Sequence, residues 1–87
     1  MRSSMPSIKK IHVHYYAILK AERGLSQETI ETRSATPWEV YRELKDKYHF
    51  RLPIEKIKVA INDEFADWQK KLNPGDNLIF IPPVAGG

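Results

Sequence analysis

The sequence predicts an α+β domain in which one main helix packs across a mixed sheet of four or five strands. An alternating run at residues 8–17 predicts the first strand, and a capped, amphipathic run that starts after Thr36 predicts the helix. Residues 77–81 are apolar on both strand faces, which is typical of a strand inside a sheet. With 87 residues the chain makes one small domain, which is too short for a two-lobed active site.

The first third of the chain predicts a strand, a short helix and a second strand. In residues 8–17 the odd-numbered side chains from Ile11 to Tyr15 share one face, and Tyr16 falls on the other. The good helix formers at residues 18–23 end in a glycine, which is typical of a short helix with a left-handed stop. Residues 27–32 are mostly polar and predict a strand at the edge of the sheet.

The clearest helix start lies at Thr36, Pro37 and Glu39. Threonine can cap the first turn, proline suits the first helical position, and glutamate three residues after the cap can complete a capping box. Pro53 prevents simple continuation of the helix. The aromatic and apolar side chains at helical spacing are expected to face the core: Trp38, Val40, Tyr41, Leu44 and Tyr48.

The last third predicts short strands joined by tight turns. Residues 58–61 read as a strand, and the Asn-Asp pair that follows reads as a turn into a short strand at residues 64–65. Residues 73–76 have the proline and glycine positions of a type II turn. The final strand covers residues 77–81, and we expect it to lie beside the first strand in the middle of the sheet. This order of elements is that of a ubiquitin-like β-grasp fold, with a flexible lead-in at residues 1–7, the domain at residues 8–81 and a protruding tail at residues 82–87.

Composition excludes several classes of protein. The chain has no cysteine, which removes disulfides, thiolate nucleophiles and cysteine zinc sites and fits a cytoplasmic protein. Its net charge of +3 is too small to indicate a nucleic-acid partner, and its apolar runs are too short to span a membrane. His12 and His14 share a strand face but lack further ligands, so we expect no metal site. The acidic cluster of Asp63, Glu64 and Asp67 is expected to be solvated rather than catalytic.

The tail is the most informative segment. Two consecutive glycines, Gly86 and Gly87, end the sequence, and Pro82 and Pro83 stiffen the exit from the last strand. The glycines carry no side chain, so a narrow channel in another protein could admit them. The carboxylate of Gly87 would then be the reactive group once a partner had activated it, and every catalytic side chain would belong to partners. The chain is therefore not expected to be an enzyme by itself.

The sequence resembles the small, sulfur-carrying subunit of molybdopterin synthase and related ubiquitin-like sulfur carriers. The resemblance covers residues 10–87. It rests on the aromatic pair and short helix at residues 15–24, on the helix start at residues 36–39 and on the Val-Ala-Ile-Asn run at residues 59–62. Its most specific part is residues 72–87, where a Gly-Asp turn, an apolar strand, Pro-Pro and Gly-Gly follow in order.

The resemblance implies a cycle in which ATP is used by a partner and no cofactor is bound by the carrier. An adenylating enzyme related to ubiquitin activators would adenylate Gly87, and a sulfurtransferase donor would convert it to a thiocarboxylate. The tail would then enter the large synthase subunit, in a heterotetramer, and give its sulfur to cyclic pyranopterin monophosphate. By the same resemblance, the segment expected to bind partners comprises Tyr16, Ile81, Pro82, Pro83, Val84, Ala85 and Gly86.

Two alternatives remain open at the level of sequence. Ala85 stands where the molybdopterin family usually has serine or threonine, and Ala-Gly-Gly is commoner in the related thiamin carrier. The chain could thus carry sulfur for thiamin or for tRNA thiolation. It could also be a ubiquitin-like protein modifier that is joined to lysines through Gly87.

Overall fold

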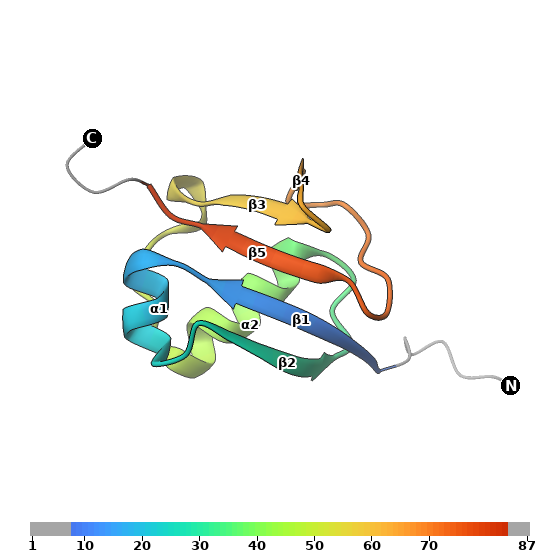
Figure 1. Ribbon diagram of the computed structural model, residues 1–87, viewed down its shortest axis with the longest axis horizontal. Helices are drawn as coiled ribbons and strands as arrows, with labels where there is room; N and C mark the ends of the chain where they lie inside the picture. The colour runs from blue at the N-terminus through green and yellow to red at the C-terminus, as the bar shows by residue number, and fades with distance from the viewer. Residues whose placement is uncertain (1–7, 84–87) are drawn as a thin grey trace, which may run out of the picture.

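The computed structural model describes residues 8–83, which form a five-stranded mixed sheet with helices on one side. The elements in chain order are β1 (Lys9–Tyr15), α1 (Ala17–Arg23), β2 (Gln27–Thr32), α2 (Pro37–Tyr48), the 3₁₀ turn η1 (Ile54–Lys56), β3 (Lys58–Ile61), β4 (Glu64–Ala66) and β5 (Asn77–Ile81). The strand order across the sheet is β2-β1-β5-β3-β4. Figure 1 looks onto the sheet, with α2 behind it and α1 at one end. This arrangement confirms the predicted ubiquitin-like β-grasp fold.

The first and last strands lie side by side at the centre of the sheet, as predicted. β1 and β5 are parallel, with Val13 opposite Leu78 and Tyr15 opposite Phe80. β2 is antiparallel to β1 at one edge, and the β3–β4 hairpin forms the other edge through β3. Both ends of the chain therefore enter or leave the sheet through its middle strands, and the tail leaves from the end of β5 (Figure 1).

The core lies between the sheet and α2. Its aromatic centre is Tyr41, whose ring stacks on Phe50 at 5.9 Å and meets Phe80 edge-on at 5.2 Å. Trp68 stacks on Phe80 and meets Tyr41 edge-on, in each case at 5.9 Å between ring centroids. The buried hydrophobic cluster consists of Ile11, Val13, Tyr15, Leu19, Val40, Tyr41, Leu44, Phe50, Ile57, Val59, Ile61, Leu72, Leu78 and Phe80. Val40, Tyr41 and Leu44 face the core as predicted, with Tyr48 packed at its margin. The prediction is wrong for Trp38, which is only partly buried and lies outside this cluster, because its ring lies beside the guanidinium of Arg42.

The start of α2 follows the prediction except in one hydrogen bond. The Thr36 hydroxyl accepts from the Glu39 amide at 3.3 Å, and Pro37 occupies the first turn. The Glu39 carboxylate, however, accepts from the amide of Ala35 at 2.8 Å and not from that of Thr36. The expected capping box is wrong in this half, because the glutamate reaches one residue further back. α2 ends at Tyr48, because the left-handed backbone of the next residue, His49 (φ 60°), breaks the helix before Pro53 is reached.

β1 is shorter than the predicted run of residues 8–17, because the backbone turns at Ala17. That residue has a left-handed φ of 52° and begins α1 directly after the extended Tyr16. α1 has seven residues and buries only Leu19 fully, so it cannot be stable alone. Its predicted stop at Gly24 is confirmed, with φ 83° and an amide that donates to the Lys20 carbonyl at 2.8 Å.

The predicted turns are confirmed as well. Asn62 and Asp63 both have positive φ, which matches the right-handed twist of the β3–β4 hairpin. Gly75 has φ 85°, and its amide donates to the Lys10 carbonyl at 2.7 Å. Asp76 joins the two turns, since its carboxylate accepts from the Asn73 amide and from the side-chain amide of Asn62. None of the helices within residues 8–83 has the length and apolar character that crossing a membrane requires.

Candidate functional site

One face of the sheet is left uncovered by α2, and we call it the outer face. Across it runs a row of four side chains, three apolar and one histidine, one from each of four neighbouring strands. The register places Phe65 of β4 opposite Ala60 of β3, Ala60 opposite Ile79 of β5, and Ile79 opposite His14 of β1. Because side chains alternate along a strand, these four residues point away from the core that their neighbours form.

Phe65 is the most exposed large hydrophobic side chain among the described residues, with 76% of its surface accessible. Phe65 lies in the middle of β4, a strand of only three residues. Sequence reasoning found the short strand but assigned Phe65 no role. The role of Phe65 depends on the pairing of β3 with β5, which adds the β3–β4 hairpin to the central strands of the sheet. The sequence alone does not show this pairing. An exposed aromatic beside half-buried Ile79 is the kind of surface that meets another protein.

The outer face leads to the segment that was predicted to bind partners. Tyr16 follows the last residue of β1 and is 51% exposed, and Ile81 ends β5 and is partly buried. Pro82 is buried whereas Pro83 is exposed, so the chain leaves the domain at this pair. The structure therefore brings Tyr16 and Ile81 to the same end of two neighbouring parallel strands, next to the start of the tail (Figure 1).

Four residues of the predicted site lie outside the described residues. They are Val84, Ala85, Gly86 and Gly87. The described part of the site is thus its base: the outer face, Tyr16, and the chain as far as Pro83.

A partly buried polar cluster joins α1 to the sheet. The guanidinium of Arg23 donates to both carboxylate oxygens of Glu28 at 2.8 Å, and its carbon lies 3.9 Å from the centre of the Tyr48 ring. The hydroxyl of Tyr15 donates to the same carboxylate at 2.6 Å. A buried tyrosine hydroxyl needs a hydrogen-bond partner, and Glu28 is the partner of Tyr15. The cluster joins β1, β2, α1 and α2 at the point where β1 turns into α1.

The charges in this cluster stabilise one another. The hydrogen bonds from Arg23 lower the pKa of Glu28, with a smaller contribution from the Tyr15 hydroxyl. Burial raises the pKa of Tyr15, and the hydrogen bond to Glu28 raises it further. Tyr15 therefore stays neutral and donates, while Glu28 stays ionised and accepts. This arrangement favours a rigid support for Tyr16 rather than a proton-transfer site.

The remaining candidates offer little for chemistry in the described part of the chain. Nδ1 of His12 lies 2.8 Å from the Thr29 hydroxyl on the outer face. Asp63, Glu64 and Asp67 are all exposed at the β3–β4 hairpin, as expected for a solvated cluster. Within residues 8–83, no group of three histidine or acidic side chains is placed to hold a metal ion. What the geometry offers is a docking face at the root of the tail.

Comparison with known proteins agrees with this geometry. A curated relative, the molybdopterin synthase sulfur carrier subunit of Mycobacterium tuberculosis, is 31% identical over 81 residues, covering 90% of this chain and 98% of the relative. Small archaeal modifier protein 1 of Haloferax volcanii has a similar structure, with a TM-score of 0.75, 23% identity and coverage of 90% and 99%. So has a chain of the complex of molybdopterin-converting factor subunits 1 and 2 from Helicobacter pylori, with a TM-score of 0.61, 23% identity and coverage of 90% and 99%.

The family assignment rests on most of the chain. The model of the ThiS family matches residues 13–87, which include β1 from Val13 onward, both helices, the rest of the sheet and the tail. The resemblance to molybdopterin synthase small subunits that the sequence motifs indicated is confirmed by the curated relative. The chain therefore belongs to the ThiS family.

Proposed function

We propose that this protein carries sulfur for molybdopterin synthesis and that its reacting group is the carboxylate of Gly87. The observation that carries the proposal is the continuity between the apolar outer face and the root of a tail ending in Gly-Gly. The name of the curated relative, a molybdopterin synthase sulfur carrier subunit aligned over 98% of its length, supports the same role.

The proposed chemistry takes place on the main chain. A carboxylate oxygen of Gly87 attacks the α-phosphate of ATP in an activating enzyme, and pyrophosphate leaves. The outer sulfur of a persulfide on a donor protein then replaces AMP at the carbonyl carbon and forms an acyl disulfide. A second thiol of the donor attacks the donor-bound sulfur, so that a donor disulfide forms and a C-terminal thiocarboxylate leaves. The thiocarboxylate gives its sulfur to cyclic pyranopterin monophosphate in the large synthase subunit, and water restores the carboxylate. The chain's own residues bind the partners and aim the tail.

The outer face is suited to binding two partners in turn. Ile81 and Tyr16 lie beside the start of the tail, and Ile79 and Phe65 continue this apolar surface across the sheet to β4. Apolar surface of this kind gives affinity for more than one partner. Pro82 and Pro83 restrict the chain as it leaves β5, so binding at the patch directs the following residues into one channel. The partners proposed are the large synthase subunit and the adenylating enzyme. The Helicobacter pylori relative, whose structure is a complex of two subunits, supports the first of these.

A single-turnover reconstitution tests the proposal. Thiocarboxylated protein is mixed with a molybdopterin synthase large subunit and cyclic pyranopterin monophosphate, and molybdopterin is quantified. Protein with a free C-terminal carboxylate serves as the control. Product from the thiocarboxylate alone supports the proposal, whereas binding without product, or no binding, contradicts it and favours a carrier for thiamin or thiolated tRNA.

A second candidate function is favoured by one comparison. The similarity to small archaeal modifier protein 1 fits a protein that is joined through its C-terminus to lysines of targets. The two functions share the adenylation of Gly87. A sulfur carrier then passes sulfur to a small molecule, whereas a modifier passes its C-terminal acyl group to a lysine. Conjugates that disappear when Gly87 is deleted, in cells with both pathways intact, would favour the modifier.

A further inference from the structure

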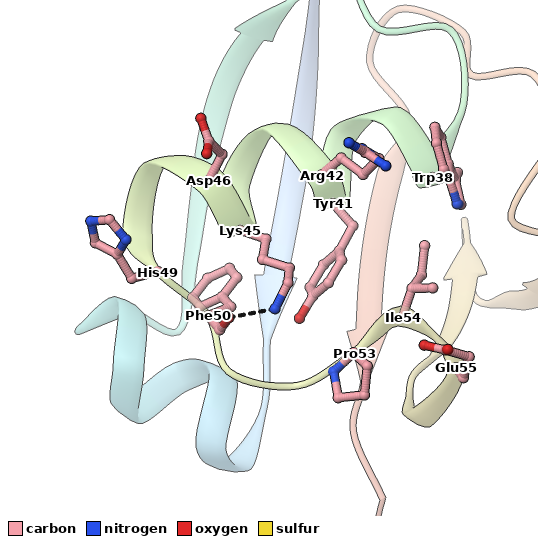
Figure 2. Close-up of a pocket in the computed structure, with 10 residues that line it drawn as sticks. All are labelled: Trp38, Tyr41, Arg42, Lys45, Asp46, His49, Phe50, Pro53, Ile54 and Glu55. Carbon is pink, nitrogen blue, oxygen red and sulfur yellow. Dashed lines mark hydrogen bonds between the residues drawn. The ribbon is translucent and has the colours of Figure 1, made fainter.

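A groove lies on the side of α2, away from the outer face. It has a volume of about 630 Å³ and runs between α2 and the segment of residues 50–55 (Figure 2). Trp38, Tyr41, Phe50 and Ile54 form its apolar floor and one wall. Figure 2 shows these side chains converging between the helix and the segment that follows it. The proposed sulfur-carrier role leaves this groove unused.

One wall of the groove carries two cations, Arg42 and Lys45. Arg42, Lys45 and His49 follow one another at helical spacing on the same side of α2, after Trp38. Within residues 8–83 the two ion pairs are Arg23–Glu28 and Arg51–Glu22, so neither Arg42 nor Lys45 is neutralised by a carboxylate.

These two cations are nevertheless held in place. The ammonium of Lys45 donates to the Phe50 carbonyl at 2.7 Å and to the Leu52 carbonyl at 3.4 Å, which ties the second wall to the helix. The guanidinium of Arg42 lies 4.8 Å from the centre of the Trp38 ring. The groove thus presents two positioned cations over an aromatic floor, a combination that attracts carboxylates attached to apolar groups.

The acidic residues near the groove define the orientation of an occupant. The carboxylate of Asp46 points away from the groove in Figure 2, and Glu55 lies on the opposite wall beside Ile54. Acidic groups of an occupant would therefore face α2. From Trp38 to His49 the helix rises about 16 Å, which equals the length of roughly five extended residues.

From these observations we propose that the groove binds an acidic, extended peptide segment of a partner protein, with an apolar side chain on the aromatic floor and carboxylates toward Arg42 and Lys45. The groove and the outer face lie on opposite sides of the domain, so this partner can bind while the tail is engaged elsewhere. The proposal concerns a second docking surface and does not depend on what Gly87 carries.

Nuclear magnetic resonance titration of the full chain tests the proposal. The probe is the blocked pentapeptide acetyl-Asp-Leu-Asp-Phe-Glu-amide, and the control peptide has lysine at its three acidic positions. We expect the acidic peptide to shift the amide signals of Arg42, Lys45, Phe50 and Ile54 and to leave those of Phe65 and Ile79 unchanged. Equal binding of the lysine peptide, or shifts centred on the outer face, would overturn the proposal.

Matched charge reversals on α2 locate the site. Arg42→Glu should weaken binding of the acidic peptide about fivefold or more, whereas Lys47→Glu, with the same change in net charge outside the groove, should have little effect. Equal losses in both variants would show nonspecific attraction and contradict the groove. Inorganic phosphate is titrated in parallel, and if it reproduces the peptide's shifts the site binds small anions and the peptide proposal is wrong. Thermal melting of each variant confirms that it is folded.

Discussion

Tyr15 and Tyr16 are neighbours in the chain with opposite environments. Tyr15 is 1% exposed and donates its hydroxyl to Glu28, whereas Tyr16 is 51% exposed at the root of the tail. Strand alternation produces this division, because Tyr16 keeps an extended backbone before Ala17 turns the chain into α1. Tyr15 therefore belongs to the packed support of the domain, and Tyr16 belongs to its exposed surface beside the end of β5.

Tyr16→Ala should separate binding from stability. We expect a change in the free energy of unfolding within about 0.5 kcal/mol, since the side chain is half exposed. We expect the affinity for a large synthase subunit to fall about tenfold or more, as for an aromatic anchor in an interface. Calorimetric titration measures the affinity. Tyr15→Phe is the control, and it should lower the free energy of unfolding while the affinity is retained. A loss of affinity in Tyr15→Phe together with a loss of stability in Tyr16→Ala would contradict this assignment of roles.

Phe65→Ser tests the outer face at the far edge of the sheet. We expect little change in stability, because the side chain is 76% exposed, and an affinity for the large subunit reduced about tenfold. Leu25→Ser is the matched control, since Leu25 is also an exposed apolar side chain but follows α1 and lies away from the row. Similar losses in the two variants would mean that general surface hydrophobicity, rather than the row, determines binding.

Glu28 makes the stability of the domain depend on pH on the acid side. Arg23 lowers the pKa of Glu28 in the folded protein below its ordinary value of 4.5. The stabilisation is therefore complete above pH 4.5 and is lost as the pH falls through the folded pKa, because the unfolded chain takes up the proton first. Glu28→Gln should lower the free energy of unfolding by about 2 kcal/mol at pH 7 and by less at pH 3. Denaturant titrations at the two pH values measure this difference, and a constant difference would contradict the assignment.

Two backbone positions should respond in opposite directions. Gly75→Ala should lower the free energy of unfolding by about 1 kcal/mol, because φ is 85° there and an added Cβ meets no atom within 4 Å, so the cost is conformational. Ala17→Gly should raise it by up to about 1 kcal/mol, since alanine at φ 52° is in the left-handed region. Thermal denaturation of both variants checks the signs, and a stabilising Gly75→Ala would contradict the left-handed turn.

Short runs of neighbouring residues predicted the helices, strands and turns. The candidate site, in contrast, depends on contacts between residues that are far apart in the sequence. Gly75 and the Thr36-Pro37 start could be read from a few neighbouring residues because turns and caps are local. The position of Phe65 in the outer-face row depends on β3 pairing with β5, and the cluster of Arg23, Glu28 and Tyr15 depends on three elements meeting. Neither arrangement has a pattern along the chain. The groove beside α2 also depends on the path of the segment after the helix.

The central claim is that Gly87 carries sulfur, and intact-mass spectrometry tests it most directly. The protein is isolated from cells in which its activating enzyme and sulfur donor are both present. The mass of the intact protein and, after proteolysis, that of its C-terminal peptide are measured. We predict a fraction heavier by the difference between one sulfur and one oxygen, confined to Gly87 and absent when the activating enzyme is deleted. A C-terminal peptide that is found only as the free carboxylate, under conditions in which the cells make molybdopterin, would contradict the account.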